Sequence, residues 1–406
     1  MIAQARQIFT FFFLTLSVVI RKLVLPLFIT LCVFGDCQPV CVYNSPARIE
    51  TSPANVYTEL SFNYWQTSQD NMELGLFNDG RISNTFTSGG TITSITSTDS
   101  THYLDMDFGF NPGFTIAVGW NFNYDDWDLR AEYTWFHNIN KHRVNSPNFL
   151  LYHSASPSIS PTWGTFFPAS IADPAYIDSF IIENYQTASE SWRVNLDTLD
   201  LDIGRWFYVG RKIVLRPSFG IRGALIDQDV HISYINGFAS FPLNIIGLTQ
   251  SFLTDDKSIN GKSRSWGTGL KMALDTEWIL GKGFRLYGSG EVDTLFTRYT
   301  ALREITQIAG SVQYSVLLSS FSFPLHDTTT GLQKNINCLR THVDLTLGIN
   351  WGMYINQLYL DTSLGYEFQV FFDQNMFRHD VNNPANFLPN GNLYIQGLTA
   401  AVKLDF

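Results

Sequence analysis

Apolar and polar residues alternate along ten stretches of this chain, and the pattern is clearest between residues 127 and 137. There the odd-numbered positions from Trp127 to Trp135 are apolar or aromatic, whereas the even-numbered ones are Asp128, Arg130, Glu132 and Thr134. Successive side chains of a β-strand point to opposite sides, so a period of two predicts a strand with one apolar and one polar face. The ten predicted strands cover residues 55–66, 103–122, 127–137, 192–206, 213–227, 262–280, 284–299, 338–351, 358–372 and 392–406.

The connections between these predicted strands alternate between long and short. The long ones are residues 67–102, 138–191, 228–261, 300–337 and 373–391, and the short ones are 123–126, 207–212, 281–283 and 352–357. Outer-membrane barrels have an even number of strands, short turns at one end and long loops at the other. We therefore predict an all-β fold, a transmembrane antiparallel up-and-down β-barrel with at least ten strands. Further hairpins within 232–252 or 311–323 would raise the number to twelve or fourteen.

The last predicted strand keeps its alternation to the final residue. Leu398, Ala400, Val402, Leu404 and Phe406 are apolar, and the residues between them are polar or small. This pattern resembles the C-terminal signature of bacterial outer-membrane barrels. The resemblance implies that Leu398, Val402, Leu404 and Phe406 form a signal for the barrel-assembly machinery. A half-buried strand of a soluble β-sandwich is the alternative interpretation of this stretch alone.

Most tryptophans fall near the ends of the predicted strands. Indole rings favour the two interfaces between a membrane and water, where they form the aromatic girdles of membrane barrels. The girdle expected here contains Trp120, Trp127, Trp135, Trp206, Trp278 and Trp351.

Composition narrows the possible partners. Charged residues make up 15% of the chain, against about 25% in a typical soluble domain. Contact with membrane lipid must come from alternating strands, because no run of about 18 apolar residues follows residue 40. The net charge of −10, without a cluster of Lys and Arg, argues against a nucleic-acid partner.

The N-terminal region predicts export. Arg21 and Lys22 precede an apolar run from residue 23 to 34, as in a secretory signal. We expect residues 1–35 to be a targeting segment that is cleaved, 36–54 a periplasmic extension, and 55–406 the barrel with long extracellular loops. A retained anchor helix is the alternative. Cleavage after Gly35 leaves an odd number of cysteines, so we expect Cys37 or Cys41 to form intermolecular disulfides with envelope proteins.

The polar faces of the predicted strands carry charges of both signs, which are costly in a dry core and ordinary in a wet lumen. This favours a passive diffusion channel for ions or small hydrophilic solutes. Acidic residues outnumber basic ones on these faces, which predicts a preference for cations, although Arg216 and Arg222 share one face and could locally favour anions. The candidate pore-lining residues are Arg130, Glu132, Arg216, Arg222, Lys271, Asp275, Glu277, Arg340, Asp344, Glu367 and Lys403.

Two other functions remain open from the residues alone. A barrel that does not conduct could act as an adhesin through its loops, since residues 84–102 are rich in Ser, Thr and Gly. A barrel protease similar to the omptins could use Asp105, Asp107, His342 and Asp344 to activate a water molecule. We expect no catalytic residues, metal or cofactor, because the chain has no His-Glu-x-x-His, Cys-x-x-Cys or phosphate-loop motif.

Several segments resemble one family. These are Phe-Gly-Phe-Asn-Pro-Gly-Phe at 108–114, Val-Gly-Trp-Asn-Phe at 118–122, Asp-Trp-Asp-Leu-Arg-Ala-Glu-Tyr-Thr-Trp-Phe at 126–136, and the motifs at 199–205, 208–212 and 216–222. They look like the Legionella-type major outer membrane protein family of pore-forming barrels, which also occurs in environmental relatives of chlamydiae. The resemblance covers most of the chain after about residue 55. It implies an abundant pore-forming barrel in the outer membrane of a Gram-negative-type cell, and it transfers no catalytic residues.

Overall fold

The computed structural model describes residues 55–78, 82–86, 92–97, 101–122, 124–146, 157–163, 182–209, 211–241, 248–316, 319–324, 328–377 and 391–406. The predictions for residues 1–35 and 36–54, including those for Cys37 and Cys41, lie outside these residues. Among the described residues, no helix has the length and apolar character needed to cross a membrane.

Ten antiparallel strands close a barrel, as the alternation predicts. Closure is complete because β1 pairs with both β6 and β17, and β9 pairs with both β7 and β11. The barrel strands are β1 (Val56–Gln69), β6 (Phe110–Asn121), β7 (Trp127–Asn145), β9 (Ile182–Arg205), β11 (Ile213–Phe241), β12 (Leu248–Gly281), β13 (Phe284–Val316), β15 (Thr328–Ile355), β16 (Leu358–Phe371) and β17 (Leu393–Asp405).

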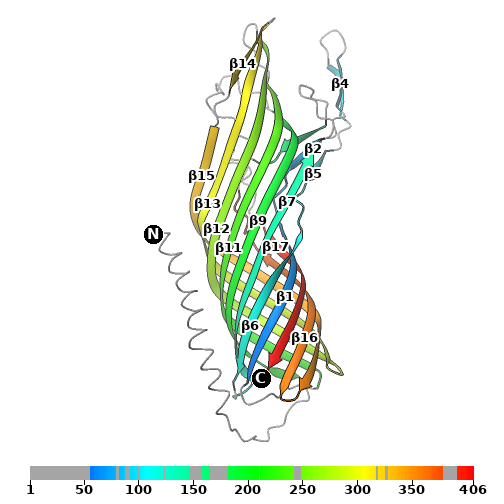
Figure 1. The fold of residues 1–406 in the computed structure, drawn as a ribbon, viewed down its shortest axis with the longest axis vertical. Coiled ribbons are helices and arrows are strands. Elements are labelled where there is room, and N and C mark those ends of the chain that lie inside the picture. The colour runs from blue at the N-terminus through cyan, green and yellow to red at the C-terminus, as the bar shows by residue number, and fades with distance from the viewer. Residues whose placement is uncertain are drawn as a thin grey trace.

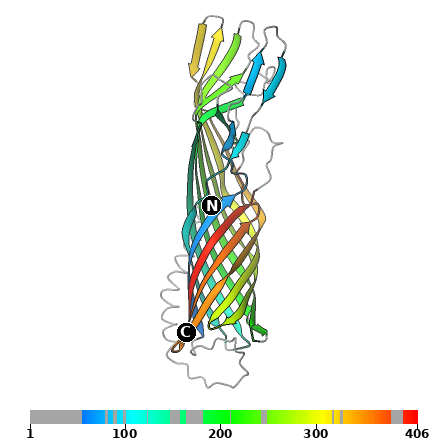
Figure 2. The same ribbon diagram turned by 90° about the vertical axis from the view of Figure 1, so that its right-hand side faces the viewer.

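The barrel is much taller on one side than on the other. Strands β9, β11, β12, β13 and β15 rise far above the level at which β1, β16 and β17 end (Figures 1 and 2). The barrel itself has ten strands, and the described parts of the segments suggested for further hairpins, 232–252 and 311–323, form paired strands without adding to it. Residues 232–241 and 248–252 continue β11 and β12, and residues 311–316 pair with β14 (Ser319–Pro324) at the end of β13. Much of what the sequence presents as long connections is strand, because the alternation continues there with weaker polarity.

Short strands lie at the tall end of the barrel. Strand β8 (Ser158–Pro161) pairs with β9 and with β2 (Gly75–Asn78), which pairs with β5 (Thr101–Leu104). A two-stranded sheet joins β3 (Ile82–Phe86) to β4 (Ile92–Ser97). At the opposite end of the barrel, β10 (Phe207–Val209) pairs with the start of β11. The predicted strand 103–122 is thus two elements. Residues 105–109 have no regular secondary structure between β5 and β6.

Tight turns join the strands at the opposite end, which we call the short-turn end and which lies lowest in Figures 1 and 2. The β6–β7 connection contains Asp125 and Asp126 with φ of 59° and 57°, and the β15–β16 turn contains Asn356 with φ of 58°. Asp and Asn tolerate this left-handed region better than other residues with a side chain, which suits them to two-residue hairpins. The turns hold the register that sends polar residues into the lumen.

The two faces of the barrel change character at one row of residues. Thr134, Thr198 and Ala224 lie side by side on β7, β9 and β11 and point into the lumen. Between this row and the short turns, which we call the lower half, outward side chains such as Leu201, Ile221 and Leu270 are apolar and exposed. We call this surface the apolar belt. Beyond the row, in the upper half, outward side chains of β9 and β11 are mostly polar and the inward ones mostly apolar.

Candidate functional site

A charged cavity occupies the lower half of the lumen. It has a volume of about 320 Å³, and all ten barrel strands contribute to its lining. The lining runs from Asn55, Asn121 and Asp126 at the short-turn end to His342 and Phe371 halfway along the barrel. Ten carboxylates and five Arg or Lys side chains line this lower cavity, so acidic groups predominate.

Arginines near the short-turn end are enclosed by carboxylates. Arg216 donates from Nε to both carboxylate oxygens of Asp128 at 3.0 Å and from Nη1 to Asp275 Oδ2 at 2.9 Å. Arg285 donates to Glu277 Oε2 and to the Tyr359 hydroxyl, each at 2.7 Å, and it also pairs with Asp361. Buried guanidinium groups need such partners, because an unpaired charge in a low-dielectric site is costly.

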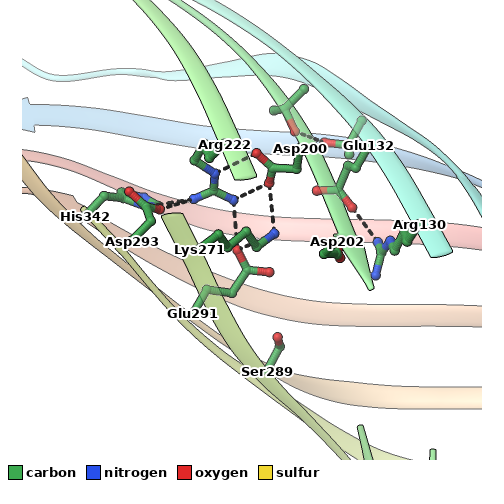
Figure 3. A network of polar contacts seen from close by, with 12 residues as sticks. Arg130, Glu132, Asp200, Asp202, Arg222, Lys271, Ser289, Glu291, Asp293 and His342 are labelled. Atoms are coloured by element: carbon green, nitrogen blue, oxygen red, sulfur yellow. Dashed lines mark hydrogen bonds and ion pairs between the residues drawn. The ribbon is translucent and has the colours of Figure 1, made fainter. Parts of the chain in front are cut away.

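A second ionic cluster crosses the lumen halfway along the barrel, and we call it the ion-pair layer (Figure 3). Arg222 on β11 contacts three carboxylates, those of Asp200, Glu291 and Asp293, at 2.8, 2.8 and 2.7 Å. Lys271 on β12 lies 2.8 Å from Asp200 and 2.9 Å from Glu291. Both cations are buried, with exposed fractions of 5% and 3%. Both cations are thus held inside the lumen, away from bulk water.

His342 joins the ion-pair layer to the apolar residues beyond it. Its Nδ1 lies 2.7 Å from Asp293 Oδ2 and 2.8 Å from Arg222 Nη1. With a proton on Nδ1 the imidazole donates to Asp293, and without one Nδ1 accepts from Arg222, so the ring has a partner in either tautomer. Its ring also packs against Phe371, with centroids 4.0 Å apart.

An apolar plug follows in the upper half. Its residues come from β1, β7, β9, β11, β16 and β17, and none is more than 4% exposed. The plug consists of Trp65, Phe136, Trp192, Val194, Leu196, Ile226, Val230, Ile232, Tyr234, Phe371 and Ile395. The rings of Trp65 and Phe136 pack against each other inside the lumen, with centroids 5.4 Å apart. Side chains of this size, packed without exposure, close the lumen to water and solutes.

Connecting segments fold inward over the plug. Tyr234 donates from its hydroxyl to the carbonyl of Leu74 at 2.6 Å, and Trp163 donates from Nε1 to the carbonyl of Glu73 at 2.9 Å. On the other side, the Tyr299 hydroxyl donates to Gln374 Oε1 at 3.0 Å. These contacts hold residues 73–74, 163 and 374 against the barrel strands.

One carboxyl group lies within the plug. Glu190 is 5% exposed and accepts a hydrogen bond from the backbone of Asp107, and its Oε1 lies 3.8 Å from His142 Nδ1. Burial raises the pKa of Glu190 to about 8, because removal from water penalises the charged form. The side chain is therefore largely protonated at neutral pH.

The eleven candidate pore-lining residues all occupy inward positions of their strands. Arg130, Glu132, Arg216, Arg222, Asp275, Glu277, Asp344, Glu367 and Lys403 line the lower cavity, Lys271 belongs to the ion-pair layer, and Arg340 lies near Asp373 and Tyr299 above it. Arg216 and Arg222 do not form a free basic face, because each is enclosed by carboxylates.

The expected girdle is only partly at the lipid surface. Trp120, Trp278 and Trp351 are exposed on the outside near the short-turn end, whereas Trp127 and Trp135 are half-buried. Trp206 was assigned to the wrong face. It lines the lower cavity, and Arg216 lies over its ring at 5.7 Å. The residue lies between β9 and β10, where the alternation is interrupted.

The residues of the C-terminal signature lie on and after β17. Leu398 and Val402 are exposed on the outward face, and the backbone N–H of Phe406 donates to the carbonyl of Val56 at 2.8 Å. Their recognition by the assembly machinery stays a prediction.

The structure does not bring together the residues of a barrel protease. Asp105 and Asp107 are exposed between β5 and β6, outside the lumen face assigned to them. His342 and Asp344 are buried in the middle of the barrel, where His342 contacts Asp293 and Phe371. No group of three or more His, Cys, Asp or Glu side chains that could hold a metal ion is found in the described part of the chain.

Two of the solved structures that are similar to this chain are outer-membrane proteins. The outer membrane protease OmpT from Escherichia coli is similar over 89% of this chain and 100% of its own, at 9% identity and a TM-score of 0.32. A Pseudomonas aeruginosa FadL homologue is similar over 90% of this chain and 93% of its own, at 9% identity and a TM-score of 0.23. No curated protein matches.

The family comparison covers the whole barrel. The family model described as Legionella pneumophila major outer membrane protein precursor matches residues 58–406, which include the lower cavity, the ion-pair layer and the apolar plug. Outer-membrane barrels have short periplasmic turns and long extracellular loops, and we assign the short-turn end and the tall end by this rule. The chain belongs to the Legionella major outer membrane protein family and is a β-barrel of a Gram-negative outer membrane.

Proposed function

We propose that this protein forms a narrow passive pore for cations and small hydrophilic solutes, and that the conformation described here is its closed state. The observation that supports the proposal is the lower cavity, which all ten strands line and in which carboxylates outnumber cations by ten to five. A barrel that served only as an anchor would have no need of so many charges in its interior, since buried charges are costly.

The apolar plug determines the resting state in this proposal. Ions that enter from the periplasmic end reach the ion-pair layer and then meet the aromatic rings of Phe371, Phe136 and Trp192. Opening requires that the plug moves and that Arg222 or Lys271 exchanges carboxylate partners. Both cations already contact more than one carboxylate, so an exchange does not leave either charge unpaired.

A second candidate is a barrel that does not conduct and acts as an adhesin or structural envelope protein. The observation that favours it is the plug itself, because complete closure suits a protein that acts through its extracellular end. Catalysis forms no part of either proposal. The separation of His342 from Asp105 and Asp107 gives no support to a protease.

Single-channel recording in a planar bilayer distinguishes the two candidates. We expect rare, small openings from the wild-type protein and long, larger openings from the Phe136→Ala/Trp192→Ala variant, which removes two rings of the plug. The matched control is Trp278→Ala, which removes an indole that is 54% exposed on the outside and should leave conductance unchanged. Silence from both folded proteins, wild-type and plug variant, would favour the adhesin.

A further inference from the structure

Charged residues are distributed unevenly over the outside of the barrel. From Asn337 to Ile355 of β15, and along β16, β17, β1 and β6, the outward positions hold no charged residue. On the other side, the residues whose side chains the structure describes include six outward cations beyond the apolar belt, in a chain whose net charge is −10. This basic patch consists of Lys141, Arg143, Arg193, Lys262, Arg264 and Arg298.

Strand register places these cations in successive rows directly above the belt. Arg298 on β13 pairs with Trp266 and lies one row beyond Phe296, an exposed belt residue. Arg264 lies in the next row, and Arg193 and Lys262 lie in the one after, separated by Asp229. Alternate residues of a strand are about 7 Å apart, so four of the six cations fall within three such steps of the belt.

Nearby carboxylates do not neutralise the patch. Lys262 lies 3.3 Å from Asp229 and Arg264 lies 3.6 Å from Asp227, and in each pair both side chains are about one-third to two-fifths exposed. Exposed pairs of this kind contribute little free energy. The acidic residues of these rows are Asp197, Asp227 and Asp229. The six cations of the basic patch therefore outnumber the acidic residues by two to one. The guanidinium and ammonium groups therefore keep donors that can turn towards a ligand.

We propose that the basic patch binds the phosphorylated sugar head group of the saccharolipid that forms the outer leaflet of this membrane, a lipid of the lipid A type. Its acyl chains would lie along the belt formed by β7, β9, β11, β12 and β13, and its phosphates would meet Arg193, Lys262, Arg264 and Arg298. Arginine pairs with phosphate through two parallel hydrogen bonds, and long cationic side chains reach from an apolar surface to a head group.

Continuity with the belt is what selects a lipid as the occupant. The patch and the apolar belt residues below it, such as Phe296 and Ile221, form one outward surface on neighbouring strands. A protein partner would need no alignment between cations and the edge of the lipid-facing surface. The proposal is independent of whether the lumen conducts.

Binding of defined lipids to the refolded full-length barrel tests this directly. Native mass spectrometry in detergent would measure apparent affinity for bis-phosphorylated lipid A, for the same lipid without its phosphates, and for phosphatidylglycerol. We expect the phosphorylated lipid A to bind at least tenfold more tightly than either of the others. Equal affinity for the dephosphorylated lipid would overturn the proposal, and equal affinity for phosphatidylglycerol would overturn the choice of a saccharolipid.

A matched pair of triple variants locates the site. Arg193→Gln/Lys262→Gln/Arg298→Gln should weaken phosphorylated lipid A binding at least tenfold. Arg211→Gln/Lys212→Gln/Lys282→Gln removes the same charge from exposed turns at the periplasmic end and should leave binding unchanged. An equal loss in the two variants, or none in the first, would contradict the assignment. Heat-modifiable migration checks that each variant is folded, and the wild-type comparison of lipids decides the outcome if the first variant does not fold.

Discussion

The lower and upper halves of the barrel are built from the same strands with opposite polarity. On β9 below Thr198, Leu199, Leu201 and Ile203 point outward, and Asp200 and Asp202 point into the lumen. Above Thr198 the inward residues are apolar and the outward ones polar. In water, apolar burial of about 25 cal/mol per Å² favours an apolar interior. In lipid there is no such gain from an apolar interior, so the polar residues gather inside.

This difference shows that the surroundings of the barrel, lipid below and water above, determine which face of a strand is apolar. The upper half resembles a soluble β-protein, with a packed core of Trp192, Ile232 and Tyr234. The lower half is inverted, and its interior is organised by ion pairs around Arg216 and Arg222. The row of Thr134, Thr198 and Ala224 marks the change, and it coincides with the outer edge of the apolar belt.

The largest expected effect is the loss of a cation from the ion-pair layer. Arg222→Met should destabilise the barrel by about 5 kcal/mol, the upper end of the range for breaking a buried ion pair, because three carboxylates lose a partner. Arg298→Met, at an exposed outward position, should change stability by less than about 0.5 kcal/mol. Urea unfolding in lipid vesicles measures both, and similar losses would show that the inward pairs have no special role.

Truncation of the plug should have a slightly smaller effect. Trp192→Ala removes a fully buried indole and should cost about 4 kcal/mol from lost burial and the cavity left behind. Trp278→Ala, on the outside of the lower half, should cost much less, because lipid replaces the lost contacts. If the two losses were equal in urea unfolding, the upper half would not be a packed core.

A third test places the same charge on one strand in the two halves. Leu201→Arg puts a cation into the apolar belt and should cost about 3 kcal/mol, within the range for the lipid face of a barrel. Ser191→Arg, also outward on β9 but beyond the belt, should change stability by less than about 0.5 kcal/mol. Folding yield and urea unfolding report both values. A tolerated Leu201→Arg would mean that the belt does not face lipid.

The last expected effect is a dependence of stability on pH, which is small over any single pH unit. The pKa of Glu190 is raised to about 8 in the folded protein, against about 4.3 in the unfolded chain. The folded state therefore holds its proton longer, so this stabilisation is complete below pH 4.3 and is lost as pH rises towards 8, by about 1.4 kcal/mol per pH unit at most.

Glu190→Gln should remove that dependence, leave stability near pH 5 almost unchanged and raise it at pH 9. Urea unfolding at both values is the measurement. The matched control is Glu73→Gln, which should leave the pH profile as it is in the wild type. A steeper loss at high pH in Glu190→Gln would contradict the burial of a protonated carboxyl group.

The sequence predicts the ten barrel strands, their order and the faces of the eleven candidate lumen residues, because alternation over ten or more residues is a strong local signal. The predicted strands are shorter than the observed ones where apolar and polar residues exchange faces. Residues 228–241 and 248–261 look like a connection if the outward face of a strand is expected to stay apolar. In the structure Val230, Ile232 and Tyr234 point into the lumen, as Arg222 does on the same strand.

The plug could not be assembled from local patterns. Trp65 and Trp192 lie near the ends of predicted strands, yet both point into the lumen. Trp65 packs against Phe136 of β7, and Trp192 packs against Phe108, which lies between β5 and β6. From Arg193 to Asp197 the polar residues take the outward positions and the apolar ones the inward positions. This exchange is the sequence signal that marks the region.

The central claim is that the carboxylate-rich lower cavity is part of a pore, and its ion selectivity is the most direct measurement. Reversal potentials would be recorded across a tenfold KCl gradient for the wild-type protein and for the Phe136→Ala/Trp192→Ala variant. The excess of carboxylates lining the cavity predicts cation selectivity in both, with the preference reduced in Glu59→Gln/Glu277→Gln. A pore that selects anions, or one whose reversal potential ignores those two carboxylates, would contradict the account.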